Sequence, residues 1–297
     1  MRNHRGFTLI ELLISLVVLG IVTASLFKLV TTSQRVSRAQ TERVTLQSNI
    51  RAGAIVLPSE LRQINAISGG VTAKQDIIST PSPNTTTLQF RAMRGLGFVC
   101  TAPIAAGTEL RIYGSPTAAW APPKFSGLRA PQAIRDSAFV FLEGANADIS
   151  SDDSWLGVRI SNVATGACAD GSTGYVLTIS PAAPTLVGAS IRGPVRTFED
   201  MEYGLYSSGG EWWLGARSVS MSEASMQPVL GPLTSDGVSF NFLDGTGAAT
   251  TDRSLVKSIQ VTLKGLTDQA IVVGSNTKTA YVRDSLVTQV VLRNALR

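Results

Sequence analysis

Residues 7–27 read FTLIELLISLVVLGIVTASLF and decide the fold of the N-terminal part of the chain. Only one charged side chain, Glu11, interrupts this stretch. An α-helix rises about 1.5 Å per residue, so a helix of this length covers roughly 30 Å, the thickness of the hydrocarbon core of a bilayer. The stretch therefore predicts a helix that spans a membrane.

The residues on either side indicate what kind of membrane segment this is. Arg2 and Arg5 form a short positive region before the apolar span, as at the start of many targeting signals. After the span the sequence continues KLV at 28–30 without an A-x-A cleavage site, so an ordinary secretory signal fits poorly. An acid such as Glu11 costs on the order of 3 kcal/mol inside an apolar span. It either snorkels to the interface or is kept for a cationic partner.

The segment Gly6-Phe7-Thr8-Leu9-Ile10-Glu11-Leu12-Leu13-Ile14, with basic residues before it, resembles the class III signal of type IV prepilins and type II secretion pseudopilins. The resemblance implies that a membrane-embedded prepilin peptidase cuts after Gly6 on the cytoplasmic side and that the new amine of Phe7 is N-methylated. The apolar segment then stays as anchor and later forms the core of a fibre. Glu11, four residues after Phe7, is expected to pair with the Phe7 amine of a neighbouring subunit.

The orientation that follows is a single-pass protein of the bacterial inner membrane with its head in the periplasm, and later in the pilus fibre or at its tip. Counting the positive charges after the span, Lys28, Arg35, Arg38 and Arg43, weakly favours the opposite orientation, but the leader motif and the cysteines outweigh it. The expected partners are the prepilin peptidase, other major and minor pilins or pseudopilins, the inner-membrane assembly platform and membrane lipid.

A second helical segment follows the span from residue 33 to 67. Its apolar residues are spaced by three and four, which predicts one face packed on the rest of the chain. They are Leu46, Ile50, Ala54, Leu57, Leu61 and Ile64. Pro58 removes a helical hydrogen bond, so a kink or a new start is expected there. The predicted organisation is a leader at 1–6, a transmembrane and amphipathic helix at 7–67 and a β-rich head domain at 68–297.

The head is predicted to be antiparallel and β-rich, which makes the fold class α+β. The expected strands lie at 87–91, 109–113, 138–142, 155–163, 174–179, 195–206, 211–217, 238–243, 254–264 and 282–293. The ending VTQVVLRN at 287–294, preceded by VTL at 261–263, is similar to the C-terminus of W-type minor pilins and J-type pseudopilins. That similarity implies a minor subunit.

The composition excludes several kinds of chemistry. The only histidine is His4, inside the expected leader, so a Ser-His-Asp site, a His-ligated zinc site and a His general base are excluded. No phosphate-binding G-x-x-x-x-G-K-[ST] motif occurs. The net charge of +5 comes without a dense basic cluster, so no nucleic-acid partner is expected. The prediction is a non-enzymatic protein without a cofactor.

Cys100 and Cys168 are the only cysteines, and in an oxidising periplasm they are expected to form a disulfide, the alternative being two buried thiols.

Two acidic loops could be interpreted as calcium sites. They contain Glu143, Asp148, Asp152, Asp153, and Asp244 with Asp252. Neither loop has the spacing of a calcium-binding loop, so no metal site is predicted and ordinary solvated turns are expected.

Trp212 and Trp213 are adjacent, so in a strand one faces the core and the other faces out. An exposed tryptophan leaves open a ligand-binding role for the head.

The leading hypothesis is a minor pilin that helps to initiate or cap a type IV pilus. The alternatives are a J-type minor pseudopilin of type II secretion and a pilus-tip adhesin that binds a surface ligand through its head. A membrane-tethered enzyme is disfavoured.

Overall fold

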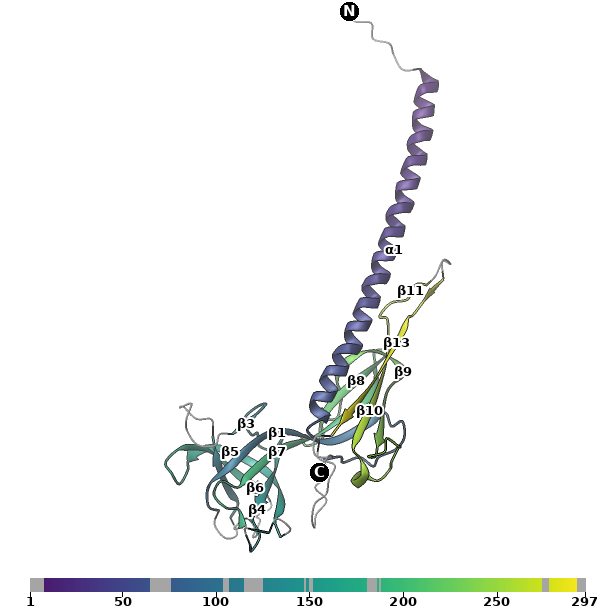
Figure 1. Ribbon diagram of the computed structural model, residues 1–297. Coiled ribbons are helices and arrows are strands. Elements are labelled where there is room, and N and C mark those ends of the chain that lie inside the picture. Colours follow the sequence, from purple (N-terminus) through teal and green to yellow (C-terminus); the bar gives the residue numbers. More distant parts are fainter. Residues whose placement is uncertain are drawn as a thin grey trace, which may run out of the picture.

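A computed structural model describes residues 8–64, 76–103, 107–114, 125–146, 148–149, 152–180, 186, 188–273 and 278–292. It consists of one long helix, α1 (Leu9–Leu61), and an antiparallel β head (Figure 1). This arrangement confirms the α+β fold class. The N-terminal half of α1 projects from the head as a stalk, and its C-terminal half lies on the head.

Among the described residues, the head has thirteen strands and a short 3-10 helix. The elements are β1 (Thr87–Thr101), β2 (Glu109–Tyr113), β3 (Ser126–Gly127), β4 (Ser137–Leu142), β5 (Ser154–Ala167), β6 (Thr173–Ser180), β7 (Pro194–Ser208), β8 (Glu211–Ser218), β9 (Gln227–Leu243), η2 (Arg253–Leu255), β10 (Ser258–Leu266), β11 (Ile271–Val272), β12 (Thr279–Ala280) and β13 (Arg283–Val291). Eleven strands form one sheet in the order β13-β10-β9-β8-β7-β4-β5-β6-β2-β1-β3, and β7 also pairs with β1.

The extra β7–β1 pairing closes part of this sheet into a barrel. Following the pairings, β7, β4, β5, β6, β2 and β1 form a ring that returns to β7. Closure leaves these strands without free edges. We call this part the barrel lobe. Its interior is filled by aliphatic side chains, among them Val99, Ile112, Val140, Ile160 and Leu177.

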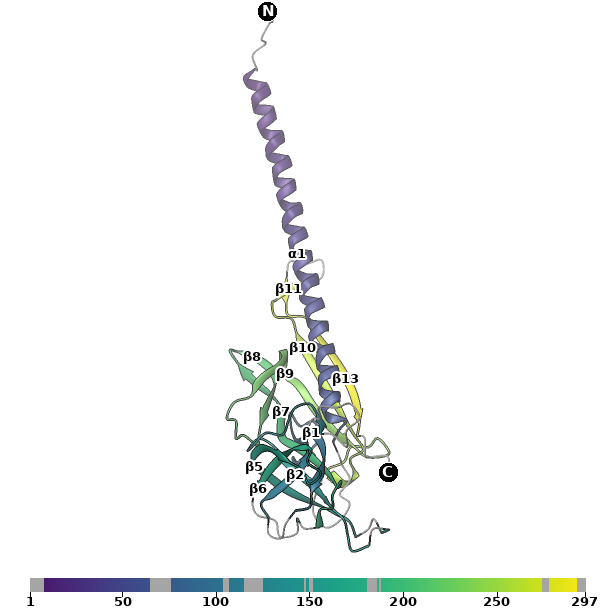
Figure 2. The same ribbon diagram turned by 90° about the vertical axis from the view of Figure 1, so that its left-hand side faces the viewer.

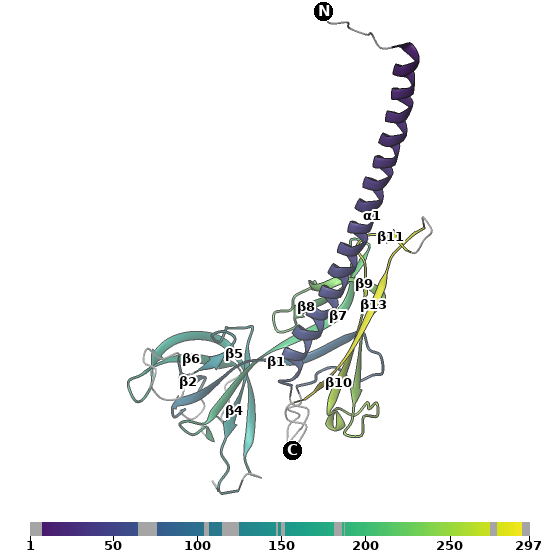
Figure 3. The same ribbon diagram turned by 45° about the horizontal axis from the view of Figure 1, so that its top comes forward.

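The remaining sheet, β13-β10-β9-β8 with the adjoining parts of β7 and β1, stays open and is covered on one face by α1; we call it the helix lobe. Its core is separate from that of the barrel and contains Phe90, Phe240, Phe242 and Val261 together with residues of α1. Only β1 and β7 run through both lobes, as Figures 1 and 3 show. Figure 2 views the same arrangement after a quarter turn, with the stalk and the head along one axis.

The predicted apolar face of α1 forms the contact with the helix lobe. Leu46, Ile50, Leu57 and Leu61 are all at most 4% exposed. The helix approaches the sheet closely at Gly53, where an added Cβ would lie 2.6 Å from a methyl group of Leu230 and 2.8 Å from one of Leu263. A side chain at this position would force these two leucine side chains, or the helix itself, to shift.

The end of α1 differs in part from the expectation at Pro58. Pro58 lies inside the helix, which continues to Leu61 before it ends. Proline lacks an N–H, so the turn before Pro58 loses one helical hydrogen bond, but the helix continues through it. The predicted limit at residue 67 and the expected turn at 68–70 lie outside the described residues.

Cys100 and Cys168 form a disulfide with a Cα–Cα distance of 5.3 Å. It links the end of β1 to the segment that follows β5, in the barrel lobe. Tyr113 and Phe98 pack beside it, and Cys100 is almost completely buried. The disulfide therefore ties together two elements of the barrel.

Candidate functional site

The first half of α1 exposes apolar side chains all around the helix. Its most apolar window has a mean hydropathy of 2.5, and none of that window is buried by the rest of the chain. Leu9, Phe27 and Leu29 are 85%, 71% and 67% exposed. Monomeric soluble proteins rarely expose a continuous apolar surface of this size. The segment is therefore suited to be surrounded by lipid or by the apolar helices of other subunits.

Glu11 lies in the first turn of this helix. The backbone N–H of Glu11 donates to the hydroxyl of Thr8 at 3.3 Å, so Thr8 caps the helix. A carboxylate near a helix N-terminus gains about 0.3–1 kcal/mol from the helix dipole. This is less than the roughly 3 kcal/mol that an acid costs within a bilayer, so the dipole alone does not offset burial of Glu11. Gly6 and Phe7 lie outside the described residues.

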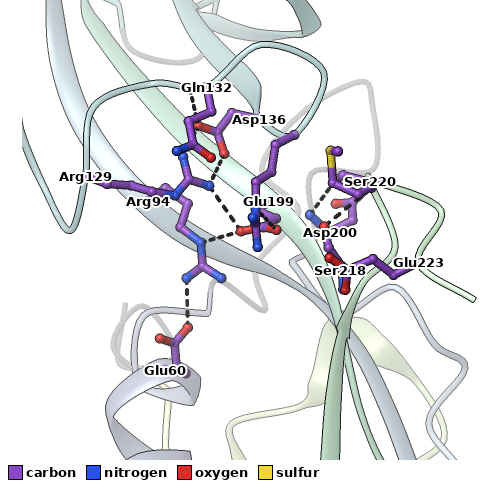
Figure 4. Close-up of polar contacts among 12 residues, drawn as sticks. Glu60, Arg94, Arg129, Gln132, Asp136, Glu199, Asp200, Ser218, Ser220 and Glu223 are labelled. Carbon is purple, nitrogen blue, oxygen red and sulfur yellow. Dashed lines mark hydrogen bonds and ion pairs between the residues drawn. The ribbon is translucent and has the colours of Figure 1, made fainter. Parts of the chain in front are cut away.

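The C-terminal end of α1 is fixed to the head by an ion-pair cluster that the sequence did not reveal. Arg94 of β1 places Nη1 3.1 Å from Glu60 Oε2 of α1 and Nε 2.8 Å from Glu199 Oε2 of β7. Figure 4 shows Arg94 between the two carboxylates. The side chain of Arg94 is only 10% exposed. One arginine thus connects the helix to the strand that enters the barrel.

Glu199 is the centre of this cluster, which we call the junction cluster. It also accepts from Arg135 Nε at 2.6 Å and from Arg129 Nη2 at 3.1 Å. Arg129 in turn makes a two-point contact with Asp136, which is completely buried. Burial by itself would raise the pKa of Glu199, but hydrogen bonds from Ser218, Arg94 and Arg135 hold that pKa below its usual range. Glu199 is therefore held as a carboxylate.

The position of the cluster follows from the strand pairing. Along β7, residues up to Phe198 pair with β4, and residues from Met201 onward pair with β8. Glu199 lies in the interval where β7 changes neighbours. On β1 the register shifts between Met93 and Gly95, so Arg94 occupies the bulge. A bulge bends its strand and redirects a side chain, which places Arg94 at the boundary of the two lobes.

Asp200, next to Glu199 in the sequence, has a different environment. Its nearest cation is Arg91, with Nε 3.7 Å from Oδ1 of Asp200. Burial raises the pKa of Asp200, and the attraction of Arg91 only partly opposes this. Its backbone N–H donates to Ser220 Oγ at 2.9 Å. The pKa values of these two adjacent acids thus shift in opposite directions, because direct hydrogen bonds outweigh the effect of burial at Glu199, whereas burial dominates at Asp200.

The two adjacent tryptophans are separated by the sheet. Trp212 packs against the core of the helix lobe. Trp213 is paired with Tyr206 across β7 and β8 and lines a surface pocket. Trp155 lies in the barrel lobe, where its ring meets Phe141 edge-on at 5.4 Å. Trp120 lies outside the described residues. Of the adjacent pair Trp212 and Trp213, only Trp213 is therefore a candidate for contact with a ligand.

The acidic loops form turns. Asp153 accepts from the Gly144 N–H and Asp152 from the Asn146 N–H. Asp244 accepts from the N–H groups of Thr246 and Ala248, and Asp252 caps η2. Within the described ranges, no group of three or more His, Cys, Asp or Glu side chains is placed to hold a metal ion.

The described residues combine an exposed apolar helix, with an acid in its first turn, and a β head. Residues 1–27 match the family profile described as the prokaryotic N-terminal methylation motif. This match supports a type IV pilin-like protein and points to a structural protein rather than an enzyme family. Together with the apolar helix it fits a single-pass protein of the inner membrane. No curated protein and no solved structure matches the chain significantly.

Proposed function

We propose that this chain is a minor pilin, a structural subunit that helps to initiate a type IV pilus or caps it. In this proposal prepilin peptidase removes residues 1–6, the amine of Phe7 is methylated, and residues from Phe7 onward remain as the anchor. The observation that carries the proposal is the methylation motif on a helix whose apolar first half is entirely exposed. Lipid or a bundle of like helices would bury such an apolar surface.

We propose that Glu11 sets the position of each subunit relative to its neighbours along the fibre. A carboxylate buried among apolar helices is strongly unfavourable unless a cation pairs with it. Processing after Gly6 would create such a cation at Phe7, and a neighbouring subunit displaced along the fibre would present it to Glu11. The partners in this step are other pilins and the inner-membrane assembly platform.

The shape of the head supports a place at the end of a fibre. The barrel lobe extends sideways from the axis of α1 (Figure 1). Subunits stacked along a common helical core have limited lateral room, whereas a subunit at the tip has none above it. We therefore propose a position at the tip, and the resemblance of the C-terminal sequence to W-type minor pilins agrees with it.

Mass spectrometry of the N-terminal peptide of the purified native chain tests the processing. The expected peptide begins with N-methylated Phe7. A chain that still begins with Met1, or that begins after residue 27, would contradict the proposal. Gly6→Leu is expected to leave the leader uncut because a branched side chain obstructs the approach of the peptidase to the backbone, while Gly6→Ala is the matched control with the smallest addition.

A J-type pseudopilin of type II secretion has the same N-terminal motif. The phenotype of a gene deletion distinguishes it from a minor pilin. Deletion of the gene is expected to abolish piliation and twitching motility and to leave protein export unchanged. Loss of export with intact pili would assign the chain to type II secretion instead.

A further inference from the structure

The face of β7 and β8 that points away from α1 carries an ordered series of residue pairs. Cross-strand neighbours on this face are Tyr206 with Trp213, Gly204 with Gly215 and Glu202 with Arg217. The alternate residues, Tyr203, Leu205 and Leu214, pack in the core of the helix lobe. Because side chains alternate along a strand, the aromatic pair, the glycine pair and the ion pair lie on one surface.

The two aromatic rings lie against glycines. A Cβ on Gly215 would lie 2.6 Å from the ring of Tyr206, and one on Gly231 would lie 2.4 Å from the ring of Trp213. Any side chain at these two positions would displace a ring. The glycines therefore let both rings rest on the backbone of the sheet, which limits their freedom before a ligand arrives.

The loop between β8 and β9 also lines the pocket. Its Met226 lies over the glycine pair, with Cε 2.8 Å from where a Cβ of Gly204 would be. Tyr206, Trp213, Arg217, Ser208, Ser225 and Met226 are among the residues that line the resulting pocket, whose volume is about 770 Å³. Pockets for small organic ligands usually have about 300–1,000 Å³.

The charge in this pocket is compensated. Arg217 Nη2 lies 2.8 Å from Glu202 Oε2, which also accepts from Gln89 Nε2 at 2.7 Å. Arg217 uses its Nε toward Glu202 as well and one Nη1 N–H toward the carbonyl of Glu223. With the described residues, two of its five N–H groups thus make no hydrogen bond. The pocket offers donors without a net positive charge, which disfavours an anionic ligand.

We propose that this pocket binds a neutral carbohydrate. A sugar ring presents C–H groups on its flat side and hydroxyls at its rim. The C–H groups are attracted to the electron-rich faces of Tyr206 and Trp213. The hydroxyls can accept from Arg217 and exchange hydrogen bonds with Ser208 and Ser225. An apolar peptide would leave these polar groups without partners.

The pocket lies on the face of the sheet opposite α1, so α1 itself does not cover it. The inference is independent of the proposed role in a fibre and would hold for any anchored head that faces the cell exterior. It adds a recognition function to a structural subunit.

The test uses the full-length chain in a detergent without a sugar headgroup, such as an amine oxide, because a maltoside headgroup would compete for the pocket. The chain is applied to an array of neutral oligosaccharides of glucose, galactose and N-acetylglucosamine. Sulfated oligosaccharides and a proline-rich peptide serve as counter-probes. The expected result is binding to at least one neutral saccharide.

Trp213→Ala is expected to weaken that binding at least tenfold, while Trp155→Ala, which removes a partly exposed tryptophan from the other lobe, leaves it unchanged. Ser225→Leu, at an exposed rim position, adds bulk without removing a packed ring and is expected to weaken binding as well; it decides the matter if Trp213→Ala fails to fold. The proposal is overturned if no neutral saccharide binds, if only the counter-probes bind, or if the folded pocket variants bind like the wild type.

Discussion

Replacing Glu199 by Gln tests whether the junction cluster holds the two lobes together. Gln keeps the shape of Glu199 and removes its charge, which three arginines face at 2.6–3.1 Å. Arg94 would retain Glu60, and Arg129 would retain Asp136. Because breaking a buried ion pair costs about 3–5 kcal/mol and two of the arginines keep a second partner, we expect a loss of about 3 kcal/mol in the free energy of unfolding.

The assay is thermal unfolding of the full-length chain in detergent, followed by near-ultraviolet circular dichroism. A loss of this size corresponds to about 6–12 °C for a domain of 150–250 residues. The control is Glu109→Gln, because Glu109 pairs with Arg111 at 2.6 Å with both side chains more than one third exposed. Such an exposed pair contributes about 0–1 kcal/mol. Equal effects of the two variants would refute the reasoning.

The same cluster predicts a dependence on pH. Since the pKa of Glu199 is lower in the fold than in the unfolded chain, its contribution is present above the unfolded value and is lost as the pH falls through the folded value. The pKa of Asp200 is raised in the fold, so its contribution to stability is present at low pH and is lost as the pH rises. The difference in stability between wild type and Glu199→Gln is therefore expected to shrink below about pH 4.3, the ordinary pKa of a glutamate. A constant difference down to pH 2 would contradict this.

Three further changes test other parts of the molecule. Gly53→Leu is expected to destabilise the helix lobe by about 1–3 kcal/mol in the same thermal assay because of its contacts with the sheet, whereas Gly20→Leu, with nothing within 4 Å of its Cβ position, leaves the melting temperature of the head unchanged. Replacing Cys100 and Cys168 together by Ser opens a loop with a sequence separation of 68, which the chain-entropy model values at about 4 kcal/mol. Hydrogen exchange should then rise in the barrel lobe first, and uniform loss of protection would contradict that. Glu11→Ala is expected to leave cleavage and membrane insertion intact and to reduce recovery in sheared fibres; recovery at the wild-type level would count against the charge register.

Local sequence patterns predicted the parts of the fold that depend on local periodicity. The strand expected at 109–113 is β2 (Glu109–Tyr113), and the one expected at 195–206 lies within β7 (Pro194–Ser208). The apolar spacing from Leu46 to Leu61 identified the buried face of α1. In each case alternation or helical spacing appears within the segment itself, so no knowledge of its neighbours was needed.

The sequence did not show that β1 continues for ten residues beyond 91, to Thr101. Gly95 and Gly97 are atypical of a strand and hide this part of it. Gly95 is needed because the ring of Phe125 occupies the space that its Cβ would fill. The closure of the barrel also depends on pairing between strands far apart in the chain. That pairing leaves no periodic signal in either strand.

The sequence did not predict the junction cluster, for a related reason. Arg94, Arg129 and Arg135 look like solvated surface residues in the sequence, and only the bulge of β1 and the change of neighbours along β7 bring them to one carboxylate. An apolar contact at this place would stabilise the junction with fewer directional constraints. Buried ion pairs with fixed geometry instead favour one orientation, because a small rotation of the barrel lobe would separate Arg94 from Glu60 or Glu199. The cluster thus adds directional contacts between α1 and the two strands that enter the barrel lobe.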